Sequence, residues 1–90
     1  MRCRFHQRKS ALVKRKHGIS LEQAVEVFDQ IHLIDQMNDD PEQYRAIGWC
    51  CGGLWSVIFE VREDRLGEYR HLVTAWKATV QEEQAYAENS

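Results

Sequence analysis

The chain has 90 residues, of which 43% are hydrophobic and 29% charged, and this composition fits one small soluble domain spanning residues 1–90. No apolar run approaches the roughly 20 residues that a membrane-spanning helix needs, and the basic start lacks the apolar segment of a secretory signal. The formal net charge is −2, but residues 1–20 hold seven cations and no acid, whereas the rest holds five cations and fourteen acids. Such a basic segment indicates a polyanionic partner, most often nucleic acid.

The cysteines and histidines argue against disulfides and metal sites. There are three cysteines, and two of them, Cys50 and Cys51, are adjacent, a spacing that seldom forms a bridge. A reducing cytoplasm is therefore the expected compartment. The four histidines are scattered at positions 6, 17, 32 and 71, and no Cys-x-x-Cys pair is present, so a zinc site has little support.

Two helices are predicted in the first third of the chain. Residues 10–16 contain no helix breaker and are followed by Gly18, which predicts a short helix with a glycine C-cap and a basic last turn. Ser20 and Gln23 form a capping-box pattern that opens a second helix reaching Gln30. Its apolar positions recur with helical spacing, so the two helices are expected to form a corner with one basic and one buried face.

The remainder of the chain predicts an antiparallel meander of about four strands. Residues 31–34 are expected to form a short edge strand and residues 35–43 a polar loop. Strands over 44–51 and 54–62 are joined by a turn at Gly52-Gly53, and a turn over 63–67 leads to a strand over 69–76. Thr79 to Glu82 form a second capping box, which opens a C-terminal helix ending near Asn89. The fold class is therefore α+β.

The chain contains no nucleophile elbow, phosphate-binding glycine loop, zincin helix or dinucleotide fingerprint. Metal-free RNA cleavage remains possible, because it needs only cations near the phosphate and side chains that move protons. The side chains available for it are Lys9, Lys16, His17, Arg45, Glu60, Arg62, His71, Lys77 and Tyr86. Each has an ordinary alternative: His17 equally fits a helix cap, Glu60 and Arg62 a surface ion pair, and Trp76 core packing. Trp49 and Trp55 are expected in the core.

Several segments resemble the BrnT family of toxins. The family's W-D-x-x-K segment is similar to Phe5-x-x-x-Lys9 here. Its K-H-G-[IV]-S-F-E-E-A segment is similar to Lys16-His17-Gly18-Ile19-Ser20-Leu21-Glu22-Gln23-Ala24, and its V-F-D segment to Val27-Phe28-Asp29. Arg45-x-Ile47-Gly48, Glu60-x-Arg62 and Thr74–Thr79 followed by Glu83 and Tyr86 resemble its later segments. The resemblance implies a RelE-like fold, metal-independent ribonuclease activity that inhibits translation, and a cognate BrnA-type antitoxin, in a possible heterotetramer.

The resemblance, combined with the residue chemistry, assigns provisional roles. Glu60, Arg62, His71 and Lys77 are the expected catalytic residues, and Lys9, Lys16, His17, Arg45 and Trp76 are expected to bind RNA. This hypothesis requires the basic amino-terminal segment to lie on the same side of the molecule as Arg62 and His71.

Two alternatives remain. The family often has arginine where His71 and Trp76 stand, which keeps open a catalytically decayed member that binds nucleic acid or protein without cutting. A DNA-binding helix-turn-helix is the weakest alternative. Its second helix carries Glu22, Glu26 and Asp29 and no cation, so DNA phosphates would repel it.

Overall fold

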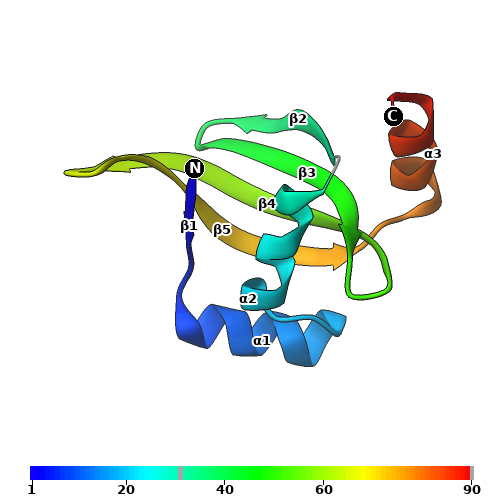
Figure 1. The fold of residues 1–90 in the computed structure, drawn as a ribbon, viewed down its shortest axis with the longest axis horizontal. Coiled ribbons are helices and arrows are strands. Elements are labelled where there is room, and N and C mark those ends of the chain that lie inside the picture. Colours follow the sequence, from blue (N-terminus) through cyan, green and yellow to red (C-terminus); the bar gives the residue numbers. More distant parts are fainter. Residues whose placement is uncertain (31, 90) are drawn as a thin grey trace.

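A five-stranded mixed sheet with three α-helices forms the fold (Figure 1). A computed structural model describes residues 1–30 and 32–89 of the chain. The elements in chain order are β1 (Arg2–Arg4), α1 (Gln7–His17), α2 (Leu21–Ala24), the 3-10 helix η1 (Val25–Asp29), β2 (His32–Asp39), β3 (Glu42–Cys50), β4 (Gly53–Asp64), β5 (Gly67–Lys77) and α3 (Val80–Asn89).

The sheet confirms the α+β class but not the predicted strand count. The strand order is β1-β5-β4-β3-β2, with β2 to β5 antiparallel and β1 parallel to β5. The prediction of an antiparallel sheet of about four strands was wrong because it omitted β1. This strand has only three residues and becomes a strand by pairing with β5, from the other end of the sequence.

Local capping signals predicted the carboxyl end of α1 and the start of α2 correctly, but α1 begins at Gln7, three residues before the predicted start at residue 10. Gly18 ends α1 in the left-handed region at φ 101°, and its amide donates to the Lys14 carbonyl. Ser20 and Gln23 form the expected capping box at the start of α2. The second helix is shorter than predicted, because four α-helical residues give way to η1, where Val27 packs closely on Gly48. A Cβ placed on Gly48 would lie 2.9 Å from Cγ1 of Val27.

The predicted polar loop over residues 35–43 was wrong, since these residues belong to the β2–β3 hairpin. Ile31, the first residue of the predicted edge strand, lies outside the described residues, and β2 extends to Asp39. An edge strand tolerates polar side chains because one of its edges faces water. The Gly52-Gly53 turn was misplaced by one residue: Cys50 pairs with Gly53, so Cys51 and Gly52, both with positive φ, form the turn.

The main core lies between one face of the sheet and α1, α2 and η1, whereas α3 contacts the other face through Arg45 and Trp76. In Figure 1, α2 lies in front of the sheet and α1 runs below β5, while α3 sits near the far end. Leu21, Ala24 and Val27 are fully buried and pack with sheet residues that include Val57 and Leu72. Trp55 is in this core as expected, but Trp49 is 52% exposed, so its core assignment was wrong.

In the part of the chain that the structure describes, no helix combines the length and apolar character required to cross a membrane. Cys3, Cys50 and Cys51 are free thiols. Burial raises the pKa of Cys50 to about 12, with its neighbour Cys51 adding to the shift, so this thiol is not a nucleophile at neutral pH.

Candidate functional site

The sheet face opposite α2 and η1 carries a group of polar side chains, which we call the open face. Arg4 and Glu60 are both directly paired with His71, from the two neighbouring strands, and Arg2 and Arg62 are both paired with Tyr69. Directly paired residues project to the same side of a sheet. The open face therefore comprises Arg2, Arg4, Gln43, Glu60, Arg62, Tyr69 and His71.

Glu60 and Arg62 form an ion pair, with 2.6 Å between Arg62 Nη2 and Glu60 Oε1. The Gln43 side-chain amide donates to the other carboxylate oxygen of Glu60 at 2.9 Å. The pKa of Glu60 is lowered, first by the Gln43 hydrogen bond and then by Arg62. Glu60 is thus an ionised carboxylate at neutral pH, fixed in position by Gln43 and Arg62. The predicted contact between Glu60 and Arg62 is present.

His71 lies half-buried at the centre of the open face. Its pKa is lowered, first by burial and then by the positive charges of Arg62, His6 and Arg4, while Glu60 acts in the opposite direction. Neutral imidazole is therefore the favoured form of His71 near pH 7. A neutral imidazole beside fixed cations can accept a proton from a hydroxyl group.

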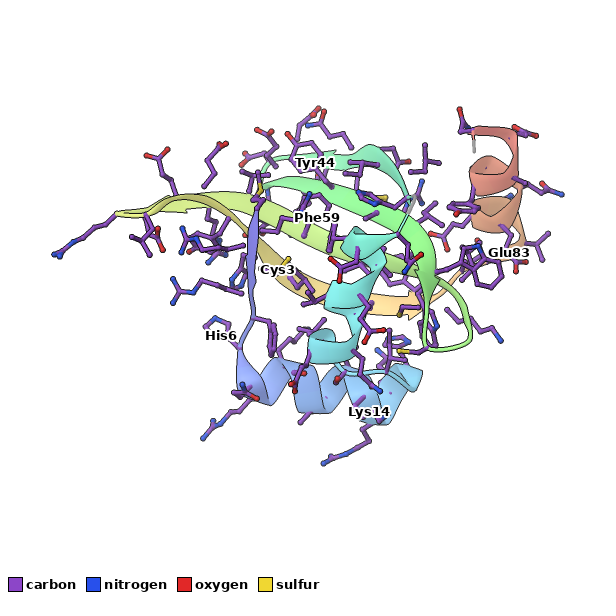
Figure 2. The ribbon with its side chains drawn as sticks, in the orientation of Figure 1. Cys3, His6, Lys14, Tyr44, Phe59 and Glu83 are labelled. Atoms are coloured by element: carbon purple, nitrogen blue, oxygen red, sulfur yellow. The ribbon has the colours of Figure 1, made fainter. Side chains whose placement is uncertain are left out.

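His6 touches His71 edge-on, with 5.2 Å between the ring centroids and 74° between the ring planes. Figure 2 shows His6 outside the core, where β1 passes into α1. It is the N-cap residue of α1, but its side chain makes no capping hydrogen bond. The amino end of the basic helix is therefore joined directly to the open face.

Arg2 and Arg4 bind near the turn between β4 and β5. Arg2 Nη2 lies 2.6 Å from Asp64 Oδ1, and Arg4 lies farther from the same carboxylate. Both guanidinium groups also stack on the Tyr69 ring, at 5.4 Å and 5.1 Å from its centroid. The Arg2 hydrogen bond, together with the Leu66 amide, lowers the pKa of Asp64 to about 2.

Helix α1 presents five exposed cations: Arg8, Lys9, Lys14, Arg15 and Lys16. Within residues 1–30 and 32–89, none of them forms an ion pair. Lys9, Lys16 and half-buried His17 line a small surface pocket of about 80 Å³ together with Thr74. Thr74 follows His71 on β5 and pairs with Ile58, so this part of α1 borders the open face.

Arg45 and Trp76 lie on the same face of the sheet as Glu60 but farther along their strands, where α3 covers them. Arg45 contacts Asp35 and also Glu82, where its Nη1 is 3.1 Å from Oε2. The Trp76 indole N–H donates to Glu82 Oε1 at 3.0 Å. Burial acts to raise the pKa of Glu82, but hydrogen bonds from the Thr79 amide and Trp76, with Arg45 nearby, bring a net lowering. These two predicted RNA-binding residues are therefore held by α3.

Lys77 is not near the other predicted catalytic residues. It pairs with Trp55, whose side chain lies in the core, so the register places Lys77 at the end of β5 on the face that α1 and α2 cover. Six strand positions separate it from His71, a span of about 20 Å.

Sequence reasoning missed Arg4, His6 and Gln43, all of which contact the predicted group. A weak signal existed at the start of the chain, because Arg2 and Arg4 alternate with the apolar Cys3 and Phe5, as in a strand with one buried face. No comparable signal marked His6, whose partner is brought to it by the parallel pairing of β1 with β5.

Comparison with protein-family models and with curated proteins found no match. In the described part of the chain, no cluster of three or more His, Cys, Asp or Glu side chains is arranged to hold a metal ion. The second helix of the amino-terminal corner buries its apolar side in the core and turns Glu22, Glu26 and Asp29 outward. That arrangement offers no recognition helix for DNA.

Proposed function

We propose that this protein is a metal-independent endoribonuclease, acting as a toxin of the type that the BrnT resemblance suggests. The observation that carries the proposal is the position of His71, half-buried between Glu60, Arg62 and Arg4 and in contact with His6, the N-cap residue of the basic helix. The His6–His71 contact supports the proposal, because it joins the amino end of the basic helix to the face that carries Arg62 and His71.

The proposed chemistry is attack of the 2′-hydroxyl of RNA on the adjacent phosphate. Neutral His71 takes the hydroxyl proton, and Arg62 and Arg4 stabilise the charge that develops on the phosphate oxygens. Glu60 stabilises the imidazolium form of His71 once the proton has been transferred. The exposed cations of α1, including Lys9 and Lys16, bind the strand on either side through its phosphates.

The test is cleavage of RNA by the purified protein in the presence of EDTA. We expect cleavage that leaves 2′,3′-cyclic phosphate ends and that stops when the scissile nucleotide is replaced by its 2′-deoxy analogue. His71→Ala is expected to slow cleavage by about 10²- to 10⁴-fold. His32→Gln is the matched control, since His32 contacts Phe28 on the other face of the sheet.

If the wild-type protein leaves RNA intact in EDTA, or if His71→Ala cleaves at the wild-type rate, the proposal is wrong. A toxin role also predicts growth arrest on expression and its relief by a co-expressed BrnA-type antitoxin. Toxicity that persists in the His71→Ala variant would separate growth arrest from RNA cleavage.

A second candidate is a binding module that holds RNA without cutting it. The ion pairing of Arg62 with Glu60 favours this reading, because a neutralised arginine stabilises a transition state less, while the α1 cations stay free to bind phosphates. Tight binding with a steep salt dependence and no cleavage would support it.

A further inference from the structure

We infer that His6 is the second proton-transfer residue of the open face, and that it protonates the leaving 5′-oxygen while His71 deprotonates the 2′-hydroxyl. This inference rests on the proposed ribonuclease function, and nothing in the sequence analysis gave His6 a role. The observation behind it is the edge contact of the two imidazole rings, 5.2 Å between their centroids.

The two rings differ in ways that separate their roles. His71 is half-buried and lies among Arg4, His6, Glu60 and Arg62, an environment with more positive than negative charge. His6 is exposed, its side chain makes no helix-capping hydrogen bond, and it stands at the edge of the sheet. A buried ring among cations suits the base, and an exposed ring can exchange protons with water, as an acid must between turnovers.

The reaction step balances with these two groups alone. The 2′-oxygen forms a bond to phosphorus as its proton moves to His71, and the bond from phosphorus to the 5′-oxygen breaks as that oxygen receives a proton from His6. The products are a 2′,3′-cyclic phosphate and a 5′-hydroxyl. His71 then carries the extra proton and His6 lacks one, and ring contact allows the proton to return through one water molecule.

A substrate with sulfur in place of the 5′-bridging oxygen tests the assignment. A thiolate leaves without protonation, since its conjugate thiol has a pKa near 8.5, so this substrate no longer needs a general acid. We expect His6→Ala to slow cleavage of the oxygen substrate by about 10²-fold or more, and to slow the sulfur substrate less than tenfold. His71→Ala is expected to slow both substrates equally.

Two other results for His6→Ala would overturn the inference. Equal losses on both substrates in His6→Ala would make His6 a structural or binding residue, and no loss on either would remove it from the reaction; both outcomes overturn the inference. Wild-type protein that cleaves neither substrate refutes both the proposed ribonuclease and the role of His6. If wild-type protein cleaves both substrates but His6→Ala slows them equally, only the role of His6 is refuted.

An NMR titration of the imidazole C–H signals adds a readout that does not depend on cleavage. Because the charge on His6 is one of the causes that lower the pKa of His71, His6→Ala is expected to shift the His71 midpoint upward. His32→Gln, which preserves the His6–His71 contact, is expected to leave that midpoint unchanged. An unmoved midpoint in folded His6→Ala protein would show that the two rings are not coupled, which contradicts the inference.

Discussion

The cations of α1 and those of the sheet differ in how their charge is used. Arg2, Arg4, Arg45 and Arg62 each face a carboxylate within the fold, at Asp64, Asp35, Glu82 or Glu60. In the described part of the chain, the exposed cations of α1 have no such partner. Arg2 and Arg4 belong to the same basic segment of the sequence as the α1 cations, yet their guanidinium groups are fixed by Asp64, whereas the α1 cations are free to attract a polyanion.

The largest expected effect comes from Arg62, the ion-paired arginine whose charge acts most strongly on the pKa of His71. If fixed arginines stabilise the transition state, Arg62→Ala lowers the cleavage rate by about 10²- to 10³-fold and changes RNA affinity little. Single-turnover kinetics on a short RNA measure the rate and the affinity separately. Arg65→Ala, an exposed arginine in the turn of the same hairpin, is the control. A rate within a factor of two of wild type would mean that the Glu60–Arg62 pair serves only the fold.

Arg45 tests the structural side of the pairing. Arg45→Ala leaves the Glu82 carboxylate, whose side chain is only 7% exposed, without its guanidinium partner. Breaking a buried pair costs about 3 kcal/mol, whereas breaking an exposed one costs about 1 kcal/mol or less. Urea unfolding should therefore show a clearly larger loss of unfolding free energy for Arg45→Ala than for Arg62→Ala. Equal losses in the two variants would contradict the assignment of Arg45 to the anchoring of α3.

The free cations are tested by removing Lys9 and Lys16 together. We expect the double alanine variant to bind single-stranded RNA more weakly and to reduce the slope of log affinity against log salt by about 1.4. The unfolding free energy should change by less than about 0.5 kcal/mol, because both side chains are exposed. Fluorescence anisotropy over a salt series measures the slope. A slope equal to that of wild type would place the RNA path away from α1.

The smallest expected effect is the pH dependence of stability from His71. Its pKa in the folded state is lowered from the ordinary 6.5, so the unfolded chain binds the proton more readily and stability falls as the pH decreases below that value. His71→Gln removes this loss. The unfolding free energy of the variant minus that of wild type should therefore increase as the pH is lowered from about 8 to about 5. The groups facing His71 are Arg4, His6, Glu60 and Arg62, and all remain in the variant. Urea midpoints at the two pH values provide the measurement, and a constant difference between the two proteins would contradict it.

Features encoded by neighbouring residues were predictable. Gly18, the Ser20 capping box and the Thr79 capping box all end or begin helices where the sequence indicates, because each depends on hydrogen bonds within a few residues. The Glu60–Arg62 contact was predictable for the same reason, since residues two apart share a strand face.

Features that depend on distant pairing were not predictable. Polar β2 became a strand because Asp35 pairs with Arg45 across the hairpin, a gain that no local propensity records. The neighbours of His71 on the open face could not be identified without β1, whose three residues are too few to display a period. Lys77 stands six positions after His71, which in a regular strand gives the same face, but a register shift that leaves Val73 unpaired turns Lys77 to the opposite face.

The parallel pairing of β1 with β5 has a consequence for how the protein is made. Arg2 binds Asp64, 62 positions later, and His6 meets His71 only after β5 has been added to the sheet. A chain still emerging from the ribosome has its first strand exposed but nothing for it to join, and α1 carries its charge before β5 exists. Synthesis therefore produces the basic helix first and brings His6 and His71 together only near the end of translation.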